Sequence, residues 1–142
     1  MQRQLKTRRL PSRTVVIEAA TNMTDVVDDL HRSGVTAILC NDDSTALDAI
    51  ASATHLGLSV PHDLSIAGYD GVPLFDHEAL GLTTYRIPVA AMAAAVGLVD
   101  KLVRAEELDG HGTLLSGELI EGRTTGPVPA SATTRQPRPS RS

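Results

Sequence analysis

Val35-Thr-Ala-Ile-Leu-Cys-Asn41-Asp42 and Leu64-Ser-Ile-Ala-Gly-Tyr-Asp70 are two apolar runs that each end in polar residues. The segment 44–57 between them is rich in alanine, which indicates a helix joining two strands. A strand, a helix and a strand that follow one another this closely form a right-handed parallel crossover, so both strands end at one edge of the sheet. We therefore predict two buried parallel strands, with Asn41 and Asp70 pointing into one shared space at the ligand-binding edge.

The composition is that of one domain with an aliphatic core. The 142 residues include one Phe, two Tyr and no Trp, so the core must be built from Val, Leu, Ile and Ala. The single cysteine, Cys40, excludes an internal disulfide and is expected to be a small buried residue. The sequence shows no apolar leader and no membrane span, which favours a cytoplasmic protein without a membrane partner.

The net charge of -4 conceals an uneven distribution of charge. Residues 1–13 carry five of the thirteen basic groups and no acid, and three further arginines lie in the last ten residues. The remaining body holds all seventeen acids against five bases, so it should repel a phosphate backbone. We therefore expect a basic flexible segment at 1–13, a disordered Pro/Ser/Arg tail at 126–142 and no direct contact with DNA, although the basic ends could touch nucleic acid weakly.

Capping residues and composition predict two further helices. Asn22 or Thr24 precedes a segment with an apolar stripe, which predicts a helix reaching about Ser33. Pro88 is well placed in the first turn of a second helix over 89–103, which is apolar on almost every side. Such a helix needs to be covered on several faces.

The other predicted elements are the cap of the central helix, three strands and two connections. Asp42 or Asp43 can cap the helix at 44–57, because a short carboxylate accepts hydrogen bonds from free amides and complements the helix dipole. Glycine, proline and β-branched residues predict strands at 14–18, 82–87 and 113–121, an extended connection at 58–61 and a surface loop at 71–81.

Four motifs give the chain its resemblance to a known family. They are Ala-Ile-Leu-Cys-Asn41-Asp42, the block Gly57-Leu-Ser-Val-Pro-His-Asp-Leu-Ser-Ile-Ala-Gly-Tyr-Asp70, Leu82-Thr-Thr with Pro88, and Glu118-Leu-Ile-Glu-Gly-Arg-Thr-Thr125. In order and spacing they resemble the effector-binding domain of LacI/GalR transcriptional repressors, over about residues 14–129. The resemblance implies an α/β fold with a Rossmann-like parallel sheet and flanking helices, as part of a periplasmic-binding-protein-like type I fold.

The resemblance also implies a two-lobed sensor in which a sugar or nucleobase changes the affinity of a dimer for operator DNA. Residues 14–125 would be a partial effector-binding domain, mainly its C-terminal lobe, without the helix-turn-helix of full-length relatives. Asn41 and Asp70 match positions at which relatives hydrogen-bond effector hydroxyls or ring nitrogens, so they are the predicted ligand-binding residues. The structural alternative is that Asn41 and Asp42 cap the following helix and that Asp70 turns the chain before Gly71.

Association between copies is a further implication of the resemblance. In relatives the segment 88–105 packs on the N-terminal lobe, so its apolar surface is predicted to be exposed here and to promote self-association. Segments 44–57 and 72–82 form part of the usual dimer face of the family, which predicts a homodimer. Several positions depart from the family pattern: Gly71 stands where a second Asp or Asn is common, and Ile87 replaces a commonly polar residue. Leu80 and Gly81 replace the usual prolines before Leu82, and Ala93 stands at a frequent glycine position.

Enzymatic functions find little support in the sequence. The acid pairs Asp42-Asp43 and Glu106-Glu107 are adjacent, which on a helix splays them about 100° apart, so they are expected to be solvated. The five histidines lack metal-ligand spacing, and no phosphate loop or nucleophile elbow is present, so we expect no catalytic residue, metal or cofactor. Three alternatives stay open: a truncated fragment that acts only through dimerisation with a full-length regulator, a stand-alone sugar-binding protein, and a flavodoxin-like or hydrolase fragment using Asp70.

Overall fold

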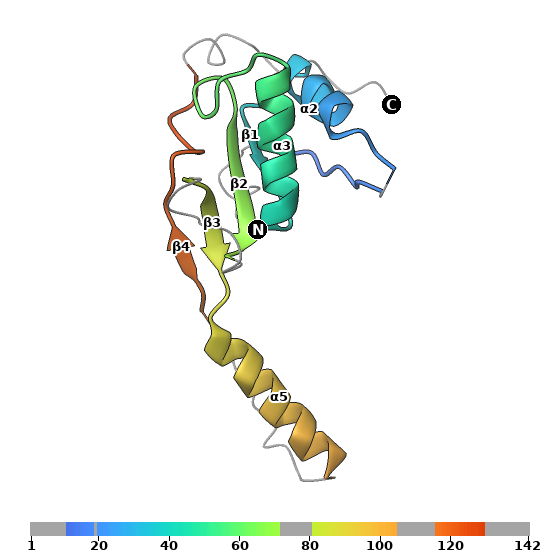
Figure 1. The fold of residues 1–142 in the computed structure, drawn as a ribbon, viewed down its shortest axis with the longest axis vertical. Helices are drawn as coiled ribbons and strands as arrows, with labels where there is room; N and C mark the ends of the chain where they lie inside the picture. Colours follow the sequence, from blue (N-terminus) through green and yellow to red (C-terminus); the bar gives the residue numbers. More distant parts are fainter. Residues whose placement is uncertain (1–10, 19, 72–80, 105–115, 130–142) are drawn as a thin grey trace.

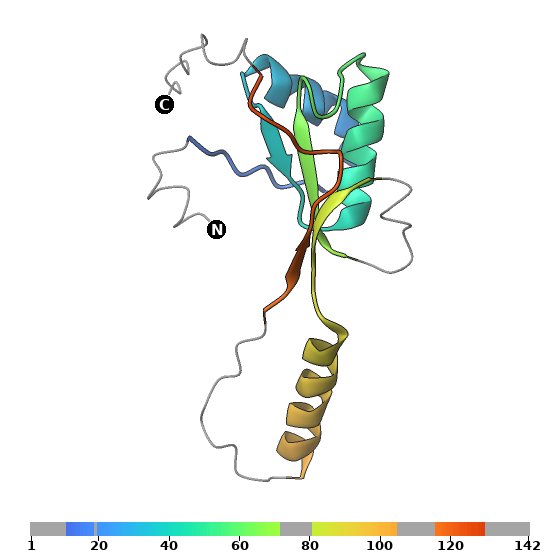
Figure 2. The same cartoon turned by 90° about the vertical axis from the view of Figure 1, so that its left-hand side faces the viewer.

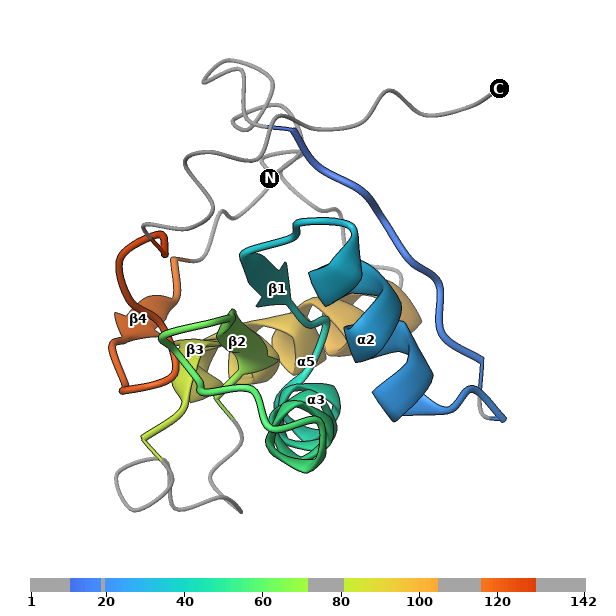
Figure 3. The ribbon, with the colours of Figure 1, turned by 90° about the horizontal axis from the view of Figure 1, so that it is seen from above.

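The computed structural model describes residues 11–18, 20–71, 81–104 and 116–129. Four strands form one sheet in the order β1 (Ala37–Leu39), β2 (Ser65–Asp70), β3 (Thr83–Arg86), β4 (Glu118–Ile120). Two helices, α2 (Met23–Arg32) and α3 (Asp43–His55), lie together on one side of this sheet (Figure 3). A third helix, α5 (Val89–Val103), extends away beyond the end of β3 (Figure 1).

The predicted crossover from β1 through α3 to β2 is present. β1 pairs in parallel with β2, with Leu39 opposite Ala67, and β2 pairs in parallel with β3, with Asp70 opposite Arg86. β4 pairs antiparallel with β3, so the predicted parallel sheet carries one antiparallel edge strand. The α/β fold with a largely parallel sheet and flanking helices is confirmed.

Local capping sets the helix boundaries that the sequence predicted. The side chain of Asn22 accepts a hydrogen bond from the backbone N–H of Thr24 at 3.0 Å and begins α2. Gly34 and Gly57 follow α2 and α3 with φ of 88° and 75°, and the left-handed conformation lets the chain leave each helix without a Cβ penalty.

The core lies between α2, α3 and the inner face of the sheet. As predicted, it is aliphatic and rich in alanine. Three alanines of α3 face inward, and a Cβ built on Gly68 would stand 3.3 Å from the Cβ of Ala46, so only small residues allow this close approach. The buried apolar residues are Val27, Leu30, Cys40, Ala46, Ala49, Ala53, Leu64, Ile66 and Leu82.

The opposite face of the sheet is partly open to solvent, which corrects the prediction of a buried strand for β1 but not for β2, most of whose residues are buried. Leu39 is 47% exposed and Leu119 is 57% exposed, and Ala37 is exposed as well. On the same face the rings of Tyr69 and Tyr85 stack with centroids 5.5 Å apart. Among the described residues, helices cover only the other face, so alternate side chains of β1 have no covering layer.

The boundaries of α5 are those predicted for the helix at 89–103. Its described side chains are exposed, and the large apolar ones are Val96, Leu98, Val99, Leu102 and Val103. In two views the helix stands clear of the sheet and of α3 (Figure 2). The prediction of an exposed apolar helix is therefore confirmed. Among the described helices, none combines the length and the apolar character that crossing a bilayer requires.

Three local predictions differ from the structure. Residues 14–18 form no strand, and Val16 is 84% exposed, because no described strand pairs with this segment. The connection at 58–61 is not fully extended, because Ser59 and Asp63 close a turn in which the N–H of Ser59 donates to the Asp63 carboxylate at 2.8 Å. The strand predicted at 113–121 is regular only over Glu118–Ile120; residues 113–115, and residues 72–80 of the predicted loop, lie outside the described residues.

The closing Thr124-Thr125 motif ties the two central strands together. The N–H of Ile66 donates to the carbonyl oxygen of Thr124 at 2.8 Å, and the N–H of Thr83 donates to its hydroxyl at 3.0 Å. Thr125 shares a hydroxyl contact of 2.9 Å with Thr83. The motif thus continues the hydrogen bonding of the sheet after β4 ends, and it holds β2 and β3 in register.

Candidate functional site

Asn41 and Asp70 lie at the same edge of the sheet, as predicted. The N–H of Cys40 still donates to the carbonyl of Ala67 at 2.8 Å, so the chain is paired with β2 up to the residue before Asn41. Asp70 is the last residue of β2. Since β1 and β2 run in parallel, both polar residues follow the carboxyl ends of adjacent strands, which is where open α/β sheets bind ligands.

A hydrogen-bonded turn orients Asn41. Its side-chain amide donates to Asp42 at 2.9 Å. Asp42, one of the two acids predicted as possible caps, is the N-cap of α3: its other carboxylate oxygen accepts from the backbone N–H of Thr45 at 2.7 Å. The bond to Asp42 uses one amide hydrogen of Asn41 and leaves its carbonyl oxygen out of that contact. Asn41 is exposed, so the amide faces solvent beside the start of α3.

Asp70 has a strained backbone. Its φ is 97°, in the left-handed region that non-glycine residues adopt at a cost of about 1–2 kcal/mol, least for Asp and Asn. Its carbonyl oxygen accepts from the N–H of Ile87 at 3.1 Å, which anchors the bend to the end of β3. Gly71 follows with φ of 61°. The residue therefore does turn the chain, and it holds a half-buried carboxylate at the sheet edge.

Arg86 and Glu118 extend this edge across β3 and β4. Arg86 stands opposite Asp70 in the parallel pairing and opposite Glu118 in the antiparallel pairing. The guanidinium of Arg86 lies 3.8 Å from the carboxylate of Glu118, and both side chains are substantially exposed. Three adjacent strands thus present Asp70, Arg86 and Glu118 in one row of alternating charge.

Asp43 corrects the prediction that the pair Asp42-Asp43 is solvated. Asp43 is fully buried, and its carboxylate accepts from the hydroxyl of Thr84 at 2.5 Å. Asp42 caps the helix instead. The other predicted acid pair, Glu106-Glu107, lies outside the described residues.

Cys40 is a buried thiol, as predicted. Burial, with a smaller contribution from the nearby Asp42 carboxylate, raises its pKa to about 11. The neutral thiol is a poor nucleophile and a poor metal ligand. Within the described ranges, no group of three His, Cys, Asp or Glu side chains could hold a metal ion.

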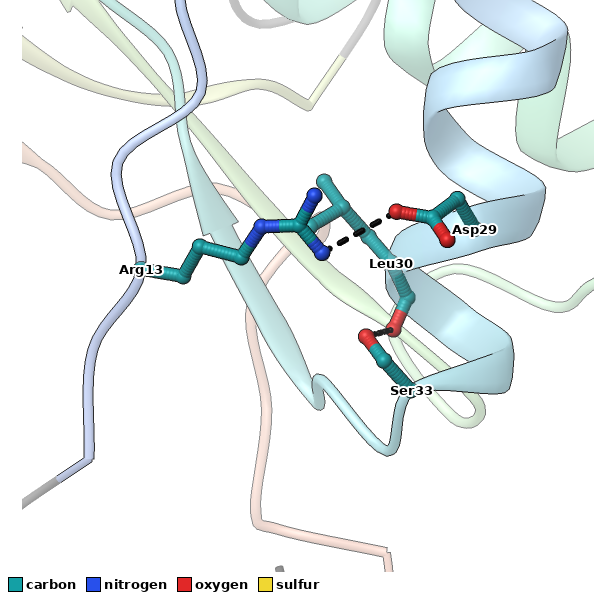
Figure 4. Close-up of polar contacts among 4 residues, drawn as sticks. All are labelled: Arg13, Asp29, Leu30 and Ser33. Atoms are coloured by element: carbon teal, nitrogen blue, oxygen red, sulfur yellow. Dashed lines mark hydrogen bonds and ion pairs between the residues drawn. The ribbon is translucent and has the colours of Figure 1, made fainter. Parts of the chain in front are cut away.

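A shallow depression of about 290 Å³ lies elsewhere, between residues 13–15 and α2. Arg13 reaches across it to Asp29 at 3.0 Å, and below it the hydroxyl of Ser33 donates to the carbonyl of Leu30 at 2.8 Å (Figure 4). The side chains of Arg13 and Asp29 are both more than half exposed, so this ion pair contributes little stability. The residues that line the depression do not come from the strand ends, so it is not part of the predicted site.

Comparison with known proteins decides the family. Residues 2–125 match the model of the periplasmic binding protein-like domain. The chain belongs to this family. It is 48% identical over 60 residues to the HTH-type transcriptional regulator MalR of Streptomyces coelicolor, covering 42% of this chain and 17% of MalR. It is 31% identical over 109 residues to the HTH-type transcriptional repressor PurR of Klebsiella pneumoniae, covering 75% of this chain and 31% of PurR.

A solved structure shares this fold. The LacI family transcriptional regulator from Arthrobacter sp. FB24, in complex with lactose, superposes with a TM-score of 0.70 at 23% identity, over 88% of this chain and 48% of that chain. The chain is therefore part of a LacI-type effector-binding domain, and it spans less than a third of the length of its curated relatives MalR and PurR. Those relatives are transcriptional regulators.

Two residues of this LacI-type domain escaped the sequence prediction. Arg86 belongs to the predicted strand 82–87, but its place opposite Asp70 depends on the register of β2 and β3, which the sequence does not specify. Asp43 follows directly after Asp42, and nothing in the sequence distinguishes the capping acid from the buried one. The available signal was the adjacent pair Thr83-Thr84: neighbouring residues of a strand face opposite sides of the sheet, so one of the two hydroxyls faces the helices.

Proposed function

We propose that this chain is the effector-sensing portion of a LacI-type DNA-binding transcriptional repressor, and that it binds a small sugar or nucleobase-like ligand at the strand ends. The observation that carries the proposal is the position of Asn41 and Asp70 at the carboxyl ends of adjacent parallel strands. Under this proposal the protein works in the cytoplasm, and the DNA contacts of the regulator come from outside residues 1–142.

The two side chains have complementary hydrogen-bonding capacity. The Asp70 carboxylate accepts from two vicinal hydroxyls, and the Asn41 amide both donates and accepts. The bond to Asp42 and the cap of α3 hold Asn41 in one orientation before a ligand arrives. Preorganisation of this kind reduces the entropy lost on binding.

Charge at the edge favours a neutral ligand. Among the residues that the structure describes at this edge, Asp42, Asp70 and Glu118 carry negative charge and Arg86 carries positive charge. A sugar phosphate would meet net repulsion, whereas a polyol would find carboxylate acceptors and guanidinium donors. We therefore expect an uncharged sugar to bind more tightly than its phosphate.

A second role rests on the exposed apolar helix α5. Five large apolar side chains from Val96 to Val103 are more than 40% exposed. Patches of this kind mark interaction sites. We propose that the chain forms homodimers, or pairs with a full-length relative, through α5 together with the surface of α3 and segment 72–82.

Thermal unfolding with named ligands tests the sensor function. The purified chain is melted alone and with lactose, sucrose, adenine or glucose 6-phosphate. A ligand that binds only the folded state at about 100 times its Kd adds roughly 2.7 kcal/mol of stability, which raises the melting midpoint by several degrees. We expect a rise with a neutral sugar and none with the phosphate.

Matched variants connect that response to the site. Asp70→Asn keeps a residue that tolerates the left-handed backbone but removes the charge, so the ligand-induced rise should be lost while the chain still folds. Asp48→Asn removes the charge of an exposed carboxylate on α3 and should leave the rise unchanged. A cooperative melt that none of the four ligands moves would contradict the sensor function and favour the role in dimerisation.

A further inference from the structure

The contact between Asp43 and Thr84 joins the first turn of α3 to β3. Both residues are fully buried, and the hydroxyl of Thr84 donates to the Asp43 carboxylate at 2.5 Å. α3 follows β1 in the chain, but its first residue is bound to β3 and not to the neighbouring strand β2. The hydrogen bond therefore passes over β2, which lies between β1 and β3 in the sheet.

Gly68 of β2 provides the space for this crossing. A Cβ on Gly68 would overlap the carboxylate of Asp43 and would stand 3.2 Å from its Cα. The start of α3 therefore rests directly on the backbone of β2, with no side chain between them. Thr84 is the direct partner of Gly68 in the parallel pairing, so the buried carboxylate sits over one row of the sheet.

This row lies immediately behind the proposed ligand site. Asp43 is two residues after Asn41, Gly68 is two residues before Asp70, and Thr84 is two residues before Arg86. Along a strand, two residues correspond to about 6.6 Å. The Asp43–Thr84 bond therefore lies one row behind the edge that carries the proposed ligand-binding side chains.

We propose that Asp43 is a positioning residue for the ligand site: its bond to Thr84 fixes the first turn of α3, and with it Asn41, at a set place relative to Asp70. The inference rests on the proposed function for its consequence in binding, but its geometry is independent of any ligand. A pair of apolar residues of similar size could fill the same space with equal or greater stability. A directional hydrogen bond, unlike apolar packing, specifies where along the sheet the helix begins.

Substitutions at Thr84 separate positioning from packing. Thr84→Val keeps the shape of the side chain and removes the donor, whereas Thr84→Ser keeps the donor. Asp43→Asn supplies a second test from the other side of the bond. Leu64→Ala, in the core just before β2, is the matched control, because it destabilises the fold without touching the strand ends.

The first measurement needs no ligand. In ¹⁵N–¹H NMR spectra of the unliganded chain, Thr84→Val should shift the side-chain amide resonances of Asn41 and the backbone resonance of Asp70. It should also speed amide hydrogen exchange at Thr45 by at least about tenfold. Thr84→Ser should keep the resonances of Asn41 and Asp70 and the exchange rate at Thr45 close to those of the unaltered chain. Leu64→Ala should lower the melting midpoint while leaving the Asn41 resonances in place. Unmoved Asn41 and Asp70 resonances in both Thr84→Val and Asp43→Asn would overturn the inference.

The second measurement is a titration with lactose. If lactose binds the unaltered chain, Thr84→Val should weaken its binding by at least about tenfold and Thr84→Ser by less than about threefold. Unchanged lactose binding in Thr84→Val would also overturn the positioning role, with the proposed function intact. If lactose does not bind the unaltered chain, the proposed function fails for this sugar, and the NMR measurement still decides whether Asp43 positions Asn41.

Discussion

The backbone of Gly71 rests against the side chain of Arg86: a Cβ added to Gly71 would stand 2.5 Å from Arg86 Cβ and 2.6 Å from its Cα. Gly71 also has φ of 61°, which favours glycine. At this position the resemblance to LacI/GalR repressors leads to the expectation of a second Asp or Asn, and the chain carries glycine instead. The chain bends so closely over β3 here that no side chain fits.

Replacing Gly71 by alanine should therefore reduce stability by more than the positive φ alone would explain. We expect Gly71→Ala to lower the free energy of unfolding by about 2–4 kcal/mol, of which about 1 kcal/mol reflects the positive φ. Gly57→Ala is the control, because its φ is 75° but nothing lies within 4 Å of the added Cβ. Urea unfolding of both variants measures the difference, and equal losses would show that the contact with Arg86 relaxes freely.

The cap of α3 should contribute to stability and to ligand response in separable ways. Asp42→Ala removes the acceptor for the Thr45 N–H and should cost about 1 kcal/mol. Asn22→Ala at the start of α2 should cost a similar amount. Only Asp42→Ala releases the Asn41 amide, so only this variant should also reduce the thermal shift produced by a bound sugar. Equal reduction in both variants would contradict a specific role for the Asn41–Asp42 contact.

The buried thiol should make stability fall at high pH. The pKa of Cys40 is about 11 in the folded chain against 9.0 for a solvated thiol, so the folded state holds the proton more tightly. The stabilisation is complete below pH 9 and is lost as the pH rises through 11, by roughly 2–3 kcal/mol in all. Unfolding free energies between pH 8 and about 11, compared with those of Cys40→Ala, isolate this contribution. A parallel pH dependence in the two proteins would contradict it.

The apolar surface of α5 should drive association. We expect light scattering to give a mass above the 15.0 kDa of one chain. The variants Val99→Glu and Leu102→Lys should lower the measured mass to that of a single chain. Leu119→Lys, on the open face of the sheet, is the comparison variant. If Leu119→Lys alone separates the copies, the sheet face is the interface, and a monomeric unaltered chain would contradict association through either surface.

Patterns local in sequence predicted the order of elements well. The helix at Val89–Val103 was predicted, and each observed cap, Asn22 and Asp42, is one of the two residues that the sequence offered, because capping bonds and helix propensity act over a few residues. The segment at 14–18 shows the limit of this reasoning. A β-branched run forms a strand only when a neighbouring strand supplies its hydrogen bonds, and none is present among the described residues.

The candidate site also has one part that the sequence predicted and another that only the structure shows. The ends of two strands, and so the shared edge of Asn41 and Asp70, follow from the apolar runs and the short helical crossover between them. The place of Arg86 opposite Asp70, the burial of Asp43 against Thr84 and the contact of Gly71 with Arg86 depend on strand register and on how closely α3 approaches the sheet. These distances are set by packing between residues far apart in the chain. The sequence by itself determined which groups reach the edge of the sheet, and only the tertiary structure decided which of them face each other, because register and helix depth are collective results of core packing.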